Sequence, residues 1–250
     1  MLKSSISPTN SALNKKILVI TEGESAEPKL IDNLVKYGII KESTEVITYG
    51  CNIHKLIKHI KNTYSDDLTS LEITAILKEI ARKNKLDFSI FNDRYSDTLL
   101  IFDFDPQDPD FNPEDVKTLL HLMTDSTSDM GKLYINYPMF ESIFFDGDSI
   151  EEIPKEMLKI KGAFKNHAQK TKTFRINNKE TKLNKTLFLE LIQRHYHWFK
   201  ILTKDFKNDE HFHLYETQIH NLKNKDKIAC LNTSILFPVD YFGNKFLKSK

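Results

Sequence analysis

Four aspartates cluster directly behind one apolar segment of this chain. Leu99–Phe102 has the composition of a buried strand, and it leads into Asp103, Asp105, Asp108 and Asp110. Carboxylates placed this close together repel one another, and such a cluster is commonly neutralised by a cation. Hard divalent ions take oxygen ligands of this kind, so Mg²⁺ (or Mn²⁺) is the expected cofactor. The structural alternative is an acidic loop that stabilises the start of the following helix through the helix dipole.

A second acidic segment lies far upstream of the first. The strand-like segment Lys16–Thr21 runs directly into Glu22. Hydrolysis of a phosphodiester needs a Lewis acid that offsets charge on the phosphate and lowers the pKa of the attacking water. Glu22, Asp103 and Asp105 together supply oxygen ligands for one such ion. Glu27 is a candidate ligand for a second ion, and the last two aspartates of the first cluster offer further oxygens.

The elements that must position these acids alternate along the first half of the chain. Short apolar segments alternate with segments of helical periodicity, which favours an α/β fold with a mostly parallel sheet flanked by helices. In such sheets ligands bind at the carboxyl ends of the strands, and both acidic segments lie there. The predicted strands are Ile17–Thr21, Glu45–Tyr49, Leu99–Phe102 and Lys132–Asn136, and the predicted helices follow Ser25, cover Ile53–Ile60 and Leu71–Arg82, and begin after Asn112.

The second half of the chain has a different pattern. Residues 146–250 are expected to form a mainly helical C-terminal lobe, with helices over Thr186–Leu202 and Asp209–Leu231. Between 155 and 185, ten basic residues stand against two acidic ones, a net charge of +8 in a chain whose total is +1. This basic insertion suits a nucleic acid held near a metal site, and a solvated lysine-rich loop is the equal alternative. The candidate nucleic-acid-binding residues are Lys159, Lys161, Lys165, Lys170, Lys172 and Arg175.

Composition places the chain among water-soluble proteins. Of its 250 residues, 40% are hydrophobic and 28% charged. No stretch approaches the roughly 18 unbroken apolar residues of a membrane span, so we expect no membrane contact. Residues 1–14 are polar and are expected to form a flexible tail without a secretory signal. Cys51 and Cys230 make no disulfide framework, so a cytoplasmic location is expected.

Two motifs resemble a known family. ILVITEGESAEPKL resembles the opening strand and helix of TOPRIM domains in OLD-family nucleases and RloB-like proteins, and KLYINYPMFES resembles a later Asn-x-Pro-x-Phe-Glu segment of the RloB-like proteins. The similarity covers residues 15–145, the predicted TOPRIM-like domain. It implies that Glu22 is a metal ligand or general base and that Asp103 and Asp105 are metal ligands.

The resemblance also implies roles for three further residues and for partners. Glu27 becomes a second-metal ligand, Lys132 the lysine that stabilises transition-state charge, and Glu141 a catalytic partner just past the fourth strand. Chains of this type resemble nuclease effectors of bacterial anti-phage systems that work with a separately encoded ATPase. This chain has no Gly-x-x-x-x-Gly-Lys-Ser/Thr segment of its own.

We therefore predict a Mg²⁺-dependent TOPRIM-type nuclease that hydrolyses DNA or RNA, tRNA included. Two alternatives stay open. One is a non-catalytic subunit that regulates or docks onto an ATPase, and the other is a metal-dependent phosphohydrolase acting on small phosphate esters. Assembly into a homo-oligomer is open as well.

Overall fold

The computed structural model describes residues 15–41, 43–50, 52–64, 71–83, 89–145, 147–171, 183–204, 209–243 and 246. The predicted tail 1–14 and residues Cys51, Lys172 and Arg175 lie outside this part of the chain. None of the described helices is both long and apolar enough to span a bilayer.

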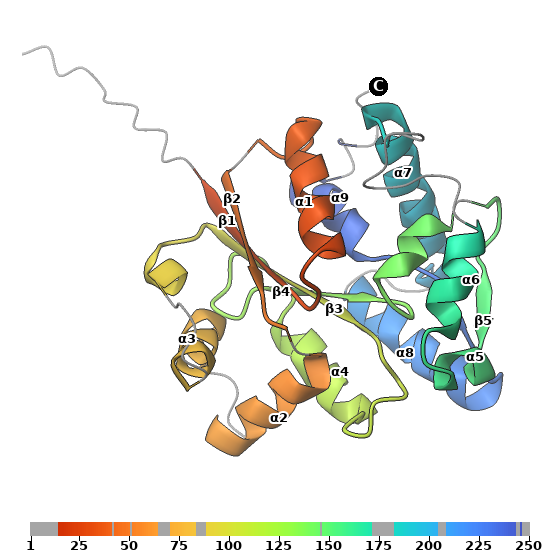
Figure 1. Cartoon of the computed structure of the whole chain (residues 1–250), viewed down its shortest axis with the longest axis horizontal. Coiled ribbons are helices and arrows are strands. Elements are labelled where there is room, and N and C mark those ends of the chain that lie inside the picture. Colours follow the sequence, from red (N-terminus) through yellow and green to blue (C-terminus); the bar gives the residue numbers. More distant parts are fainter. Residues whose placement is uncertain are drawn as a thin grey trace, which may run out of the picture.

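A four-stranded, all-parallel sheet forms the centre of the protein (Figure 1). Its strand order is β2-β1-β3-β4, and the middle strands β1 and β3 are buried along almost their whole length around apolar centres. This confirms the predicted fold class, an α/β protein with a parallel sheet covered by helices. The strands are β1 (Lys16–Thr21), β2 (Ser43–Thr48), β3 (Asp97–Asp103) and β4 (Lys132–Asn136).

Helices cover both faces of this sheet, as Figure 1 shows. Helix α1 connects β1 to β2 and lies on one face, whereas α2, α3 and α4 lie on the other. Right-handed crossovers produce this arrangement, because the chain moves one way from β1 to β2 and the opposite way afterwards. The bounds are α1 (Ala26–Lys36), α2 (Ile53–Tyr64), α3 (Ile73–Lys83), η1 (Ser89–Asn92) and α4 (Pro113–Leu122).

The strand order reverses between β1 and β3. In open parallel sheets, the crevice at the carboxyl ends of the two strands on either side of such a reversal is where ligands bind. Strand β1 ends at Thr21, which pairs with Ile101 of β3, and β3 ends at Asp103, which pairs with Asn136 of β4. The two predicted acidic segments therefore leave neighbouring strands at this reversal point.

The C-terminal lobe is mainly helical, as predicted, but two of its segments differ from the expectation. The stretch 147–185, which showed no periodicity, contains a short strand and two helices. The helix expected over Asp209–Leu231 ends at Asn224, because the apolar residues after it form a strand paired with Ile153. The elements are η2 (Phe140–Phe144), β5 (Glu152–Pro154), α5 (Lys155–Lys159), α6 (Ala163–Thr171), α7 (Lys185–Leu202), α8 (Glu210–Asn224), β6 (Lys227–Ala229), η3 (Ser234–Leu236) and α9 (Phe237–Phe242).

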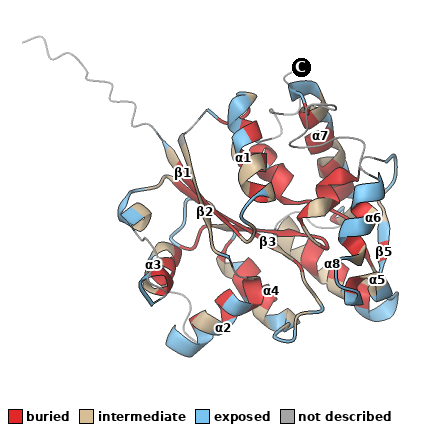
Figure 2. Ribbon diagram, viewed as in Figure 1, coloured by how far each residue is buried: buried red, intermediate tan, exposed pale blue. Residues whose placement is uncertain are grey.

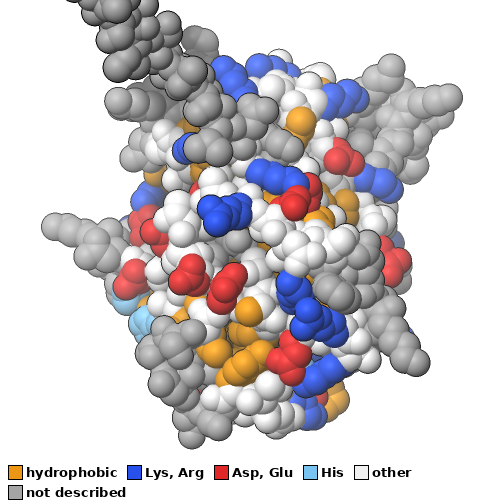
Figure 3. Space-filling model, turned by 90° about the vertical axis from the view of Figure 1, so that its left-hand side faces the viewer, with side chains coloured by type: hydrophobic (Ala, Val, Ile, Leu, Met, Phe, Trp, Pro, Cys, Tyr) orange, Lys and Arg blue, Asp and Glu red, His pale blue; other side chains and the backbone are white. Residues whose placement is uncertain are grey.

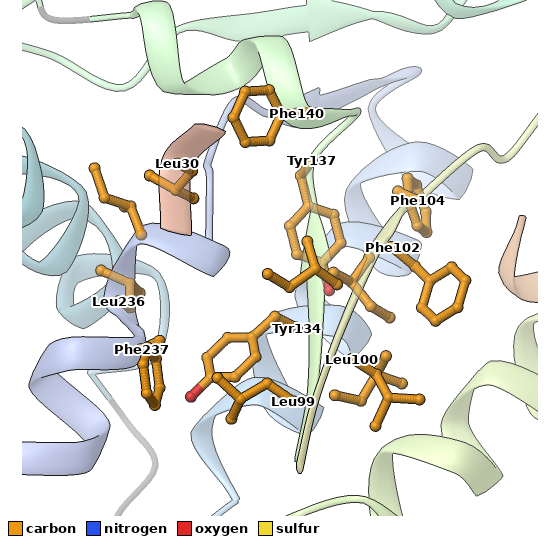
Figure 4. Close-up of a cluster of buried hydrophobic side chains, with 14 of the residues drawn as sticks. Leu30, Leu99, Leu100, Phe102, Phe104, Tyr134, Tyr137, Phe140, Leu236 and Phe237 are labelled. Atoms are coloured by element: carbon orange, nitrogen blue, oxygen red, sulfur yellow. The ribbon is translucent and has the colours of Figure 1, made fainter. Parts of the chain in front are cut away.

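One continuous hydrophobic core joins the sheet and the C-terminal lobe. Figure 2 shows the buried residues along the sheet and on the helix sides that face it. In the close-up of Figure 4, Tyr134 of β4 lies beside Phe237 of the C-terminal segment. The Thr233 hydroxyl donates a 2.8 Å hydrogen bond to the Ile135 carbonyl, and Tyr137 bridges to Leu231. The lobe is thus bonded to the sheet at the carboxyl end of β4, close to the candidate site.

Candidate functional site

Glu22 lies over the end of strand β3. Its backbone N–H donates to the Ile101 carbonyl at 3.1 Å, which extends the β1–β3 ladder by one residue. Its side-chain Oε2 accepts a 3.1 Å hydrogen bond from the backbone N–H of Asp103. Residues 81 apart in sequence are therefore in direct contact, and the predicted convergence of the two acidic segments is present in the structure.

Asp103 carries a buried carboxylate oxygen to which no described residue donates a hydrogen bond. Its Oδ1 is sealed from solvent and has no hydrogen-bond partner among the described residues. Burial, followed by the charges of Glu22 and Glu27, raises the pKa of Asp103 well above its usual range. Native proteins leave few buried polar atoms without a partner, and such atoms commonly mark ligand or catalytic sites. A cation or a hydrogen-bond donor placed at Asp103 Oδ1 would lower the pKa of Asp103 and favour its ionised form.

The pKa of Glu22 is also displaced. Burial raises the pKa of Glu22 to about 7, although the hydrogen bond from the Asp103 N–H opposes the shift, and the charges of Asp105 and Glu27 add to it. Like charges close together disfavour ionisation of one another. Glu22 and Asp103 therefore titrate as parts of one coupled group of carboxylates, and a bound cation would draw the whole group toward the ionised form.

Asp105 is held by a buried aromatic residue beside it. Phe104 is 1% exposed and packs edge-on against Phe111 and Tyr215, which anchors the backbone between the two acids. Asp105 itself has a left-handed backbone, with φ of 39°, and its Oδ1 accepts a 2.9 Å hydrogen bond from Gln107 Nε2. A left-handed aspartate is uncommon and turns the chain sharply after the strand. Burial raises the pKa of Asp105 as well.

Glu27 reaches the same region from the first turn of α1. Glu27 is 5% exposed. Burial raises the pKa of Glu27, and hydrogen bonds from backbone N–H groups partly offset this rise. Its carboxylate lies against Gly23: a Cβ built on Gly23 would come within 2.6 Å of Glu27 Oε2. The glycine after β1 therefore leaves room for this carboxylate, a role beyond that of a simple turn.

Glu141 and Lys165 complete the cluster. Glu141 lies at the start of η2, and its Oε1 is 3.2 Å from Lys165 Nζ on α6. The charge of Glu141, with smaller contributions from Asp103 and Glu27, raises the pKa of Lys165, which stays protonated. Lys165 is thus a basic residue of the C-terminal lobe that faces the acids of the sheet.

The structure does not bring Lys132 to this site. Lys132 is the first residue of β4 and pairs with Leu99, whereas the acids lie where Asp103 pairs with Asn136. Four residues of strand span about 13 Å. Lys132 Nζ instead forms a 2.7 Å ion pair with Asp240 of α9. The prediction of a catalytic Lys132 is therefore wrong in its geometry, because a residue at the start of a parallel strand lies at the opposite edge of the sheet.

The last two aspartates of the cluster already have partners on helix α2 and at the residue before it. Asp108 Oδ2 accepts a 2.6 Å hydrogen bond from Asn52, and Asp110 is 2.9 Å from Lys58 Nζ. They are therefore poorer candidates for a second metal than Glu27.

A groove of about 630 Å³ lies beside the acids and the basic insertion. Its charged lining residues are Asp105, Asp108, Lys159, Lys161 and Lys165. Of the other predicted nucleic-acid ligands, Lys170 is exposed on α6 away from the groove lining, and Lys172 and Arg175 lie outside the described residues.

The residues present fit a hard divalent cation by their chemistry. Several carboxylates converge at the β1–β3 reversal, and the Oδ1 atom of one of them, Asp103, has no partner in the described part of the chain. Within the described ranges, no three His, Cys, Asp or Glu side chains are already arranged as ligands of a single metal ion. Glu22 Oε2 is engaged by the Asp103 N–H, so coordination would require this side chain to turn toward the ion.

Two residues near the acids were not assigned to the site from sequence. Lys165 was expected only to bind nucleic acid, and the polar, non-periodic sequence around it gave no signal for α6. His54 of α2 is 2% exposed, its two ring nitrogens have no hydrogen-bond partner among the described residues, and its charge acts on Asp105. No spacing in the sequence links His54 to the acidic segment.

A scan against protein-family models finds no match, and searches of curated proteins and of solved structures find none either.

Proposed function

We propose that this protein is a Mg²⁺-dependent, TOPRIM-type nuclease that hydrolyses phosphodiester bonds in DNA or RNA. The proposal rests on one observation above all: Glu22 and Asp103 meet at the reversal point of a parallel sheet, and the buried Oδ1 of Asp103 has no hydrogen-bond partner among the residues that the structure describes. Carboxylates with strongly shifted pKa values at a ligand-binding edge are typical of functional sites, and a bound cation would favour their ionised form.

In this mechanism Asp103 and Asp105 would hold the cation, and Glu27 is the candidate ligand of a second one. A bound Mg²⁺ or Mn²⁺ would supply a Lewis acid that polarises the phosphate and lowers the pKa of water. Glu22, whose pKa is about 7 without the cation, would have one of two roles: a third ligand of the ion, or the base that accepts a proton from that water.

Lys165 takes the part that the resemblance assigned to Lys132. It is the ammonium group that interacts with Glu141 and, more weakly, with Asp103 and Glu27. A fixed cation beside the phosphate stabilises negative charge that develops in the transition state.

The groove favours a polymeric substrate over a small phosphate ester. Three lysines line it next to Asp105, and they extend the positive surface beyond the space that one phosphate group needs. A chain of phosphates binds such a surface through counterion release, with an affinity that falls steeply as salt rises.

The cellular setting of the proposal rests on the resemblance. A cytoplasmic effector of anti-phage defence, controlled by a separately encoded ATPase, is the setting that the TOPRIM-like motifs imply. A non-catalytic subunit of such an assembly is the rival, and it predicts partner binding without cleavage by any assembly.

The test is cleavage by the purified full chain with Mg²⁺ or Mn²⁺, using single-stranded and duplex DNA, RNA and tRNA. Asp103→Asn and Glu22→Gln should abolish cleavage, whereas Asp110→Asn, at a neighbouring acid already paired with Lys58, should keep it. Equal cleavage by Asp103→Asn and the unaltered protein would overturn the assignment. Hydrolysis of small phosphate esters with nucleic acids left intact would favour the phosphohydrolase.

A further inference from the structure

The groove beside the carboxylates has an apolar side that phosphate binding does not explain. Besides its acids and lysines, it is lined by Pro138, Met139, Met157, Leu158, Ile160 and Phe164. Phe164 is buried, but Ile160 is 63% exposed, the most exposed of the large hydrophobic side chains in the described chain. It lies in the turn between α5 and α6; Lys159 ends α5, Lys161 shares the turn, and Lys165 belongs to α6.

The charges around Ile160 identify the kind of ligand. Lys159 and Lys161 flank it in sequence, and Lys165 follows one turn into α6. Lys159 pairs with Glu156 at 2.6 Å, whereas no ion pair of Lys161 is found among the described residues. An apolar side chain between ammonium groups suits a ligand that alternates flat apolar surfaces with anionic groups.

An unpaired nucleotide has this character and a duplex lacks it. In a double helix the bases are stacked inside, and the outer surface offers phosphates and sugars to a protein. In a single strand the bases are free to turn outward and lie against apolar side chains while the phosphates meet lysines. The volume of about 630 Å³ is in the range of cofactor-sized sites, which admits one or two extruded nucleotides rather than a double helix.

We propose that this groove binds an unpaired stretch of nucleic acid, with bases against Ile160 and the two methionines and with phosphates along the lysines. The inference rests on the proposed function for what happens next, because it makes the nuclease one that acts on single strands or loops. The binding itself does not require cleavage and is measurable without metal.

The first experiment measures binding of the full chain to fluorescent oligonucleotides by anisotropy, in EDTA and at fixed salt. A single strand and a blunt-ended, fully paired duplex of equal length are compared. We expect the single strand to bind about tenfold more tightly. Ile160→Ser should weaken single-strand binding about fivefold and leave duplex binding unchanged. Ile201→Ser is the matched control, because Ile201 is an exposed isoleucine of α7, 47% exposed, outside the groove.

Two outcomes would overturn the inference. One is equal affinity for the single strand and the duplex, and the other is an Ile160→Ser variant that binds the single strand as tightly as the Ile201→Ser variant does. A lack of measurable single-strand binding falls under the first outcome.

The second experiment separates this inference from the proposed function. Cleavage is measured with Mg²⁺ on the same two oligonucleotides. Tight, Ile160-dependent binding of the single strand without any cleavage would support the groove assignment and contradict the nuclease. Cleavage of the duplex as fast as the single strand would support the nuclease and contradict the groove assignment.

Discussion

Strand β3 begins at Asp97 and ends at Asp103, and these two aspartates have opposite surroundings. Asp97 is 3% exposed, and its two oxygens accept hydrogen bonds from the hydroxyls of Ser126 at 2.7 Å and Ser96 at 2.8 Å. Asp103 has an oxygen equally shielded from water, and that oxygen has no partner among the described residues. The same residue type on the same strand is satisfied at one end and unsatisfied at the other.

Strand β4 repeats the contrast. At its start, Asp240 is surrounded by donors: Lys132 at 2.7 Å, His211 at 3.1 Å and the Tyr134 hydroxyl at 3.0 Å. Burial alone would raise the pKa of Asp240, but the hydrogen bond and charge of His211, with Lys132, hold it well below its usual range. Beyond the end of β4, the carboxylates have Lys165 as their nearby cation.

The difference separates a structural edge of the sheet from a candidate binding edge. At the amino ends, the chain supplies its own counter-charges, and Figure 3 shows acidic and basic side chains interspersed on this side of the molecule. At the carboxyl ends, the buried Oδ1 of Asp103 has no hydrogen-bond partner among the described residues, and burial raises the pKa values of Asp103 and Glu22. A fold that satisfies polar groups at one edge and leaves them unsatisfied at the other sacrifices stability where a ligand is needed.

The sharpest test compares the same substitution, aspartate to asparagine, at the two ends of β3. Asp103→Asn should lower the cleavage rate by about a thousandfold, because it removes a ligand of the proposed cation. Asp97→Asn should keep the cleavage rate within a few-fold and lower the free energy of unfolding by about 1–3 kcal/mol, because two hydroxyls lose an acceptor charge. Cleavage assays and urea unfolding measure the two quantities. Loss of cleavage in Asp97→Asn with unchanged stability would contradict the comparison.

The two lysines give the next test. Lys165→Met should lower the cleavage rate about a hundredfold, because it removes the cation beside the acids. Lys132→Met should leave the rate unchanged and lower the free energy of unfolding by about 1 kcal/mol, since Asp240 keeps His211 as a partner. Lys170→Met, on the same helix as Lys165 but outside the groove lining, controls for the general loss of positive charge.

The sequence was enough to predict a parallel sheet and to place both acidic segments at the carboxyl ends of its strands. Apolar segments alternating with amphipathic helices imply a parallel sheet, and the carboxyl ends of neighbouring parallel strands meet at one edge. Glu22 and Asp103 were therefore predicted to lie at the same edge of the sheet. Their contact depends on β1 and β3 being neighbours, which the sequence pattern does not determine by itself.

The rest of the site depends on contacts that leave no periodic signal. Lys165 reaches the acids because α6 packs against η2, and nothing in its polar surroundings marks that packing. Asp108 accepts a hydrogen bond from Asn52, a residue more than fifty positions earlier in the chain. Lys132 was misplaced for a different reason: its motif match suggested a role, but strand length carries it to the far edge of the sheet.

Stability should also depend on pH in a way that reports on the binding edge. The folded protein raises the pKa of Glu22 to about 7 from an ordinary value near 4.5, so between these values the folded state binds more protons than the unfolded state. The contribution of Glu22 to the free energy of unfolding should therefore fall by up to about 3 kcal/mol as pH rises from 4.5 to 7. The unfolding of Glu22→Gln and of the unaltered protein, measured in urea across this range without metal, isolates the contribution.

Magnesium provides the control for this dependence. The cation competes with protons for the same oxygens, so it should raise the melting temperature at pH 8 and have little effect at pH 5.5. An equal magnesium effect at both pH values would place the ion elsewhere on the protein.

Two glycines offer the finest comparison of the two edges. At Gly131, before β4, φ is 72° and an added Cβ would come within 2.7 Å of the Thr98 backbone carbonyl, which has little freedom to move. Gly131→Ala should therefore lower the free energy of unfolding by about 1–3 kcal/mol. At Gly23 the added Cβ meets the end of the Glu27 side chain, which can turn away. Gly23→Ala should cost less than about 0.5 kcal/mol.

For Gly23→Ala, the informative measurement is therefore the effect of magnesium on the melting temperature, not the stability of the metal-free protein. Displacing the Glu27 carboxylate should reduce the magnesium-induced rise in melting temperature, whereas the magnesium-induced rise in Gly131→Ala should stay that of the unaltered protein. If Gly23→Ala responds to magnesium as the unaltered protein does, Glu27 is no ligand, and the carboxylates that matter at this edge reduce to Glu22, Asp103 and Asp105.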